Sequence, residues 1–101
     1  MRAINPATGE TLADYPDTSP EEVNRLLGRA EQAFAAWRRE PFAKRARRMR
    51  RLAELLGERR AESARLITAE MGKPIAAAEA EIDKCALGCT FYAEHAEAFL
   101  A

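Results

Sequence analysis

The two cysteines have the most reactive side chains in this sequence, and they lie four residues apart. Cys85 and Cys89 fall one turn apart on the same face of a predicted helix. Such a pair could bind a metal or act as a redox pair. A four-coordinate zinc site needs two more ligands, and the only histidine, His95, falls roughly opposite on that helix. We therefore predict that both cysteines are buried and unreactive.

A basic cluster is the second candidate for chemistry, because lysine or arginine fills six of the eight positions 44–51. One interpretation is a helix face that contacts phosphates. The other is a solvated face paired with acids elsewhere, since Phe42, Ala46 and Met49 still mark a buried stripe through the cluster. The sixteen basic and sixteen acidic residues cancel, which favours the second interpretation. We expect neither nucleic acid nor a membrane as a partner.

Catalytic and cofactor-binding motifs are missing from the sequence. His95 has no serine, cysteine or aspartate partner at a recognisable spacing, so a catalytic dyad is unsupported. No G-x-G-x-x-G motif occurs, and Gly72-Lys73 lacks the upstream glycine and the following serine or threonine of a phosphate-binding loop. The sequence therefore predicts no catalytic and no cofactor-binding residue in this chain.

Length and composition describe an ordinary folded protein. The chain has 101 residues, of which 48% are hydrophobic and 32% charged, so it is one domain or a piece of one. No apolar run approaches the ~20 residues that span a bilayer. Two cysteines without a larger framework fit a reducing cytoplasm, and we expect a cytoplasmic location.

The first elements that these residues imply are a hairpin and two helices. Residues 1–16 form a predicted β-hairpin around the turn residues Asn5 to Gly9. A capping box with proline at the first helical position begins a helix at Ser19-Pro20, and Pro41 ends it. A second helix spans about Phe42 to Met71, with a kink or brief break near Gly57.

The third helix has the most regular apolar pattern. Gly72 in the left-handed conformation ends the second helix, and Pro74 begins the third. Apolar residues then recur at steps of three or four to the end of the chain. This stripe comprises Ile75, Ala78, Ile82, Cys85, Cys89, Tyr92, Ala96 and Phe99. Because it continues to the last residues without a cap, we expect a truncation point. We also expect exposed apolar surface that includes Ile82, Cys89, Phe99 and Leu100.

Two signatures resemble the aldehyde dehydrogenase superfamily. Ile4-Asn5-Pro6-Ala7-Thr8-Gly9-Glu10 looks like its opening hairpin, and Glu70-Met71-Gly72-Lys73-Pro74 looks like the segment between its second and third helices. The order and spacing of further motifs extend the resemblance over essentially the whole chain. The final stretch is most similar to succinate-semialdehyde dehydrogenases within the superfamily.

The resemblance implies a mostly α segment of a larger α/β fold. It implies an N-terminal β-hairpin at 1–16 and an incomplete three-helix layer at 17–101 of the nucleotide-binding domain. The full-length enzyme would oxidise an aldehyde with NAD or NADP through a thiolate, a glutamate base and cofactor loops. All of these lie downstream of this segment, which is therefore scaffold and inactive alone. The remainder of the chain would be its partner, and the enzyme would be a homo-oligomer.

The resemblance also implies a structural site for a monovalent cation. Its ligands here would be the backbone carbonyl of Ile4, or of Ala3, and the carboxylate of Glu97. The alternative for the whole chain is an autonomous helical interaction module that uses the basic cluster 44–51. The two interpretations differ in whether 101 residues satisfy their own apolar faces.

Overall fold

The chain begins with a short antiparallel hairpin in the computed structural model, which describes residues 1–100. β1 (Arg2–Ile4) pairs with β2 (Thr11–Asp14). In the connecting loop the Asn5 side chain accepts a hydrogen bond from the backbone N–H of Ala7 at 2.9 Å, and Gly9 adopts a φ of 75°. The predicted hairpin is therefore present, and its turn uses the residues that the sequence indicates.

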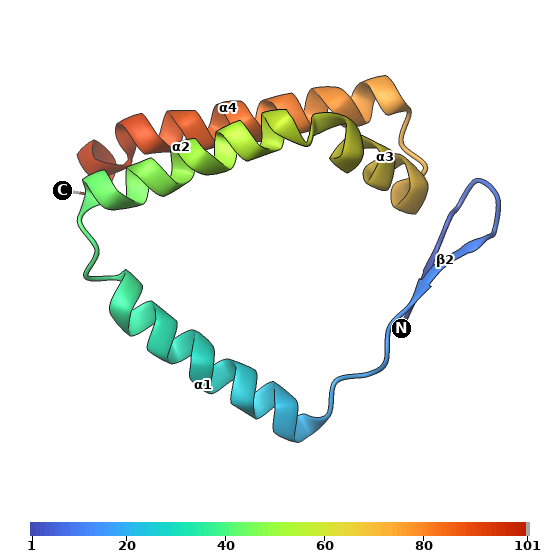
Figure 1. Cartoon of the computed structure of the whole chain (residues 1–101), viewed down its shortest axis with the longest axis horizontal. Helices are drawn as coiled ribbons and strands as arrows, with labels where there is room; N and C mark the ends of the chain where they lie inside the picture. The colour runs from blue at the N-terminus through green and yellow to red at the C-terminus, as the bar shows by residue number, and fades with distance from the viewer. Residues whose placement is uncertain (101) are drawn as a thin grey trace.

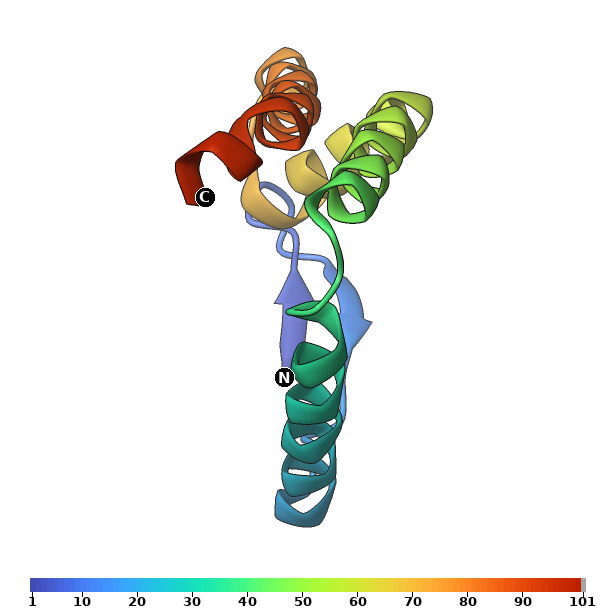
Figure 2. The ribbon, with the colours of Figure 1, turned by 90° about the vertical axis from the view of Figure 1, so that its left-hand side faces the viewer.

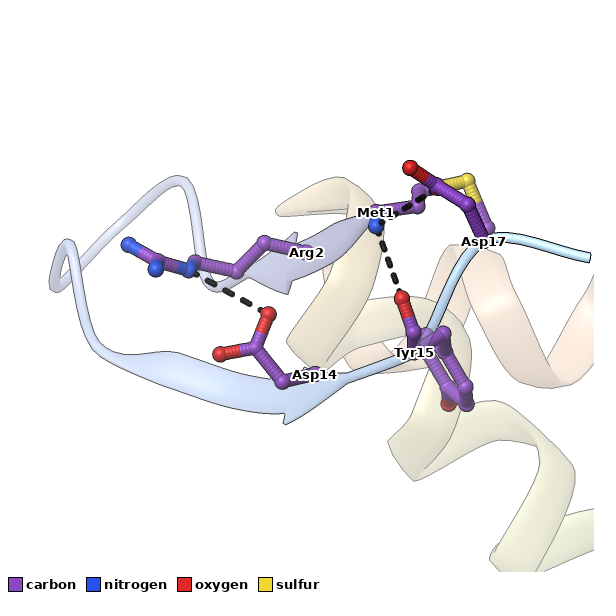
Figure 3. A network of polar contacts seen from close by, with 5 residues as sticks. All are labelled: Met1, Arg2, Asp14, Tyr15 and Asp17. Atoms are coloured by element: carbon purple, nitrogen blue, oxygen red, sulfur yellow. Dashed lines mark hydrogen bonds and ion pairs between the residues drawn. The ribbon is translucent and has the colours of Figure 1, made fainter.

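Polar contacts also join the first two residues of the chain to the segment at and after the end of β2 (Figure 3). The Met1 ammonium donates to the carbonyl of Tyr15 at 2.8 Å and lies 3.5 Å from the Asp17 carboxylate. Arg2 faces Asp14 across the two strands, also at 3.5 Å. All these side chains are exposed, so the contacts align the strands and add little stability.

Helix α1 (Pro20–Trp37) begins at the predicted cap. The Ser19 hydroxyl accepts a hydrogen bond from the backbone N–H of Glu22 at 3.2 Å, and Pro20 occupies the first position. No residue of α1 is buried, and the helix packs closely against none of the other described elements. Its apolar stripe is therefore exposed along its whole length.

The segment predicted as one broken helix forms two, α2 (Phe42–Glu58) and α3 (Arg60–Met71). Arg59 separates them, with φ −103° and ψ 16°. The expected break near Gly57 is therefore real, and it gives four helices where the sequence analysis counted three. The reason is tertiary, because the change of direction lets α3 pack against the start of the last helix, α4 (Ile75–Leu100).

Gly72 ends α3 in the left-handed conformation, with φ 69° and its N–H donating to the carbonyl of Thr68 at 3.0 Å. Pro74 directly precedes α4, and its carbonyl accepts from the N–H of Ala78. The predicted helix stop and restart is confirmed.

The core is small and lies where α4 meets α2 and α3. Only Ala64, Ala78 and Ile82 are buried among the hydrophobic residues described. Ile82 was expected in the exposed surface, and that expectation is wrong because Ile82 faces the neighbouring helices. Phe99 and Leu100 are 60% and 70% exposed, as expected, and Cys89 is half-buried.

The helices form an open, flat arrangement (Figures 1 and 2). Helices α2 and α4 lie side by side, whereas α1 and the hairpin stand away from them. The molecule measures 48 × 40 × 20 Å with a radius of gyration of 17.6 Å, against about 13 Å for a compact domain of this length. Within residues 1–100, no helix is long and apolar enough to cross a membrane.

The accessible surface is correspondingly large. It amounts to 7953 Å², roughly 2,200 Å² more than the scaling law for folded monomers gives at this mass. Large apolar side chains contribute to it from every helix. An excess of this size equals the surface that one partner contributes to a large, stable interface.

Candidate functional site

The two residues predicted to bind a cation lie in different parts of the molecule. Ile4 belongs to β1, whereas Glu97 lies near the end of α4, beside the start of α2. Figure 1 shows the hairpin and the C-terminal end of α4 on opposite sides of the arrangement. The structure does not bring the two residues together. The cation site stays a prediction from the resemblance.

The described part of the chain also lacks a cluster of His, Cys, Asp or Glu side chains that could bind a metal ion. Within residues 1–100, no three His, Cys, Asp or Glu side chains form a group that could hold a metal ion. Cys85 and Cys89 are free thiols, and Cys85 is exposed. The prediction that both are buried is therefore wrong for Cys85, because α4 turns that position away from the small core.

His95 lies in an aromatic stack on the surface of α4. Its ring lies 4.4 Å from that of Phe91 and 6.2 Å from that of Phe99, measured between centroids. Its Nδ1 is 2.8 Å from the carbonyl oxygen of Phe91. These contacts are local to one helix, and they give His95 a packing role in this chain.

The basic cluster 44–51 is solvated and only partly paired. Lys44 pairs with Glu40 at 2.8 Å, and Arg51 pairs with Glu54 and Glu58 at 2.9 and 3.0 Å. The acids of α4 do not supply these partners within residues 1–100. The expected pairing with acids elsewhere is therefore confirmed only for these two residues, within one or two turns. Lys44 lowers the pKa of Glu40 by its hydrogen bond.

A clamp of arginine and two acids joins α3 to α4 instead. The Arg60 guanidinium donates to both carboxylate oxygens of Asp83, at 2.7 and 2.9 Å, and lies 3.1 Å from Glu79. Its hydrogen bond lowers the pKa of the Asp83 carboxyl. Lys73, just before α4, pairs with Glu81, eight residues along the chain. Sequence reasoning missed this clamp because Arg60 and Asp83 are 23 residues apart.

The two signature segments touch each other. The ring of Pro6, in the hairpin loop, lies against Gly72: a Cβ added to Gly72 would meet the Pro6 Cγ at 3.1 Å. A hollow beside this contact is lined by Asn5, Arg65 and Thr68, and the Thr68 hydroxyl is buried without a hydrogen-bond partner. The loop of the hairpin therefore approaches the turn between α3 and α4. We refer to the Pro6–Gly72 contact as the clasp.

Known proteins match this arrangement along the whole chain. The model of the aldehyde dehydrogenase family matches residues 1–101. A probable succinate-semialdehyde dehydrogenase [NADP(+)] from a Synechocystis species is 49% identical over 101 residues. Succinate-semialdehyde dehydrogenase [NADP(+)] 1 from Mycobacterium tuberculosis is 47% identical over the same length. This chain spans only 22% of each of those proteins.

Solved structures agree with the sequence matches. A succinic semialdehyde dehydrogenase from Streptococcus pyogenes, in complex with NADP+, aligns over 99% of this chain with a TM-score of 0.91 and 30% identity. An NAD-dependent aldehyde dehydrogenase from Sinorhizobium meliloti aligns over 97% of the chain, with a TM-score of 0.88 and 35% identity. The chain covers 22% and 20% of those two structures. The open arrangement of hairpin and helices is therefore shared with segments of much larger proteins.

Proposed function

The chain belongs to the aldehyde dehydrogenase family, and we propose that it is the N-terminal scaffold of an NADP-dependent succinate-semialdehyde dehydrogenase. The observation that carries the proposal is the match of all 101 residues to proteins of that name at 47–49% identity. The proposed reaction oxidises succinate semialdehyde to succinate and passes a hydride to NADP. NADP is preferred over NAD because the names of these relatives specify it.

The structural role of the chain follows from its own residues. Pro6 of the hairpin loop lies against Gly72 in the clasp, and the Arg60 clamp joins α3 to α4. The apolar stripe of α1 and the end of α4 stay uncovered. We propose that the remainder of the dehydrogenase chain covers them. The surface excess of roughly 2,200 Å² is of the size that such packing needs.

The described residues do not fit a dinucleotide. The sequence has no glycine-rich phosphate loop leading into a helix, and the hollow beside the clasp is lined by short side chains and one arginine. The nucleophile, the base and the cofactor site are therefore assigned to the remainder of the protein. A homo-oligomeric enzyme in the cytoplasm stays part of the proposal.

The alternative of an autonomous helical module is not supported. The family match extends over the whole chain, while the relatives are about four to five times longer. The uncovered stripe of α1 also argues against a self-sufficient module, because such a module would bury its own amphipathic helix.

A segment exchange tests the proposal directly. In the Synechocystis relative, the matching segment is replaced by this chain, and the purified chimera is assayed for succinate-semialdehyde-dependent reduction of NADP. We expect a soluble chimera with NADP-dependent turnover. A second chimera that carries Gly72→Val, which opens the clasp, should lose soluble protein, whereas the matched Gly57→Ala change should not. A folded, soluble chimera without turnover would contradict the proposal.

A further inference from the structure

Helix α1 has an apolar stripe but no apolar partner among the described residues. Its N-terminus is capped by Ser19, none of its residues is buried, and it stands away from α2 and α4 (Figure 1). Leu27 and Phe34 are 63% and 61% exposed. The large side chains of this α1 stripe are Val23, Leu26, Leu27, Phe34 and Trp37. Because helices in proteins are stabilised mainly by the packing of such a face, α1 needs a partner outside the described residues.

Helix α4 is apolar on two faces, and the described residues cover only one of them. Ala78 and Ile82 are buried where α4 meets α2 and α3. Phe91 follows Ile82 by nine residues, about two and a half turns, and therefore falls on the opposite face. Leu87, one turn before Phe91, shares that face. Leu87 and Phe91 are 69% and 45% exposed, and a helix that is apolar on both sides belongs in the interior of a larger protein.

The relatives indicate the size of the partner that would cover these faces. This chain spans 22% of the Synechocystis and Mycobacterium tuberculosis relatives, so most of their length lies outside the matched segment. The chain exposes roughly 2,200 Å² more surface than a folded monomer of its mass. Interfaces that bury this much surface on each partner hold separate polypeptides together without a covalent link.

We propose that this chain binds the remainder of the dehydrogenase as a separate polypeptide, and that the α1 stripe is its anchor. The remainder is the part of such an enzyme that follows the position of Ala101. The inference rests on the proposed function, and it adds that the peptide bond after this position is not needed for assembly. Phe99 and Leu100 are 60% and 70% exposed, so a chain break after them removes no buried contact of the described residues.

A split version of the Synechocystis relative tests this inference without isolating either part. This chain, untagged, is co-expressed with an affinity-tagged form of that relative from which the matching segment has been removed. We expect the two polypeptides to co-purify in a one-to-one ratio and to reduce NADP in the presence of succinate semialdehyde. Recovery of the tagged polypeptide without this chain would overturn the inference. Retention of this chain by a tagged second copy of itself, but not by the remainder, would overturn it too.

The covalent chimera separates this inference from the proposed function. If the chimera turns over while the split pair does not associate, only the inference fails and the proposed function stands. A folded, soluble chimera without turnover contradicts the proposed function, whether or not the split pair associates.

Charge substitutions on two faces of α1 locate the anchor. Leu27→Asp places a carboxylate in the α1 stripe, and Gln32→Asp places one on the opposite, polar face of the same helix. Because an unpaired charge is costly to bury, Leu27→Asp should lower the amount of co-purified chain about tenfold or more, whereas Gln32→Asp should leave it unchanged. Neither change reaches the core of α2, α3 and α4, because α1 does not pack closely against those helices. Equal recovery of the two variants would refute α1 as the anchor.

Discussion

Replacing Gly72 by alanine tests the clasp, because two separate costs act at this position. The φ of 69° costs an L-residue about 1–2 kcal/mol. The new Cβ would also meet the Pro6 Cγ at 3.1 Å, so that the Pro6 ring has to give way by a few tenths of an ångström. Reduced freedom of the unfolded chain returns roughly 0.4–1 kcal/mol. We expect a net loss of about 1–2 kcal/mol for Gly72→Ala, and more for Gly72→Val.

Substitutions at two other glycines distinguish the cost of the positive φ from the cost of the contact with Pro6. Gly9 has a φ of 75° but no atom within 4 Å of an added Cβ, so Gly9→Ala pays only for the backbone conformation. Gly57 lies inside α2 with open space around it, and Gly57→Ala should stabilise by about 0.5–1 kcal/mol. The order of stability should therefore be Gly57→Ala above wild type, then Gly9→Ala, then Gly72→Ala.

The assay is urea unfolding followed by the helical circular dichroism signal, repeated in a Pro6→Ala background. Removing the Pro6 ring should relieve the contact at Gly72 but not the cost of its φ. A double-mutant cycle should therefore give a coupling energy between these two sites and none between Pro6 and Gly57. Additive effects of Pro6→Ala and Gly72→Ala, or a more stable Gly72→Ala protein, would refute the clasp.

Four further outcomes are expected. Because the Arg60 hydrogen bond lowers the pKa of Asp83 below 3.8, its stabilising effect is present above about pH 4 and is lost as the pH falls through the lowered pKa. Urea midpoints measured from pH 6 to pH 2.5 should fall less for Asp83→Asn than for wild type, and an identical decline would contradict this. Ala78→Leu should destabilise by about 1–3 kcal/mol in the same unfolding assay, since Ala78 is fully buried at the small core; an unchanged midpoint would show that the helices tolerate the added volume. The 101-residue chain should bind a hydrophobic dye or self-associate in sedimentation, and a compact, dye-silent monomer would instead favour a self-sufficient fold. Assayed alone with succinate semialdehyde and NADP, it should show no turnover, so robust activity of the pure chain would reassign the catalytic residues.

Local sequence signals determined the ends of the elements. Ser19 and Pro20 specify the start of α1, and Gly72 with Pro74 specifies the stop of α3 and the start of α4. Each signal acts on backbone dihedrals and hydrogen bonds within a few residues, so neighbouring residues suffice to predict it. The same short motifs carried the resemblance to the aldehyde dehydrogenase family, and the match of the family model to residues 1–101 confirms it.

Contacts between distant segments were decided only by the tertiary structure. The apolar period of α4 is equally regular at Ile82 and at Phe99, yet the first is buried and the second is exposed. The difference depends on where α2 and α3 pack along α4, which no local pattern encodes. The same holds for the clasp between Pro6 and Gly72, and for the separation of the hairpin from the C-terminal end of α4. Sequence periodicity predicts which face of a helix is apolar. The angles between the helices decide which part of that face is buried against a neighbouring helix.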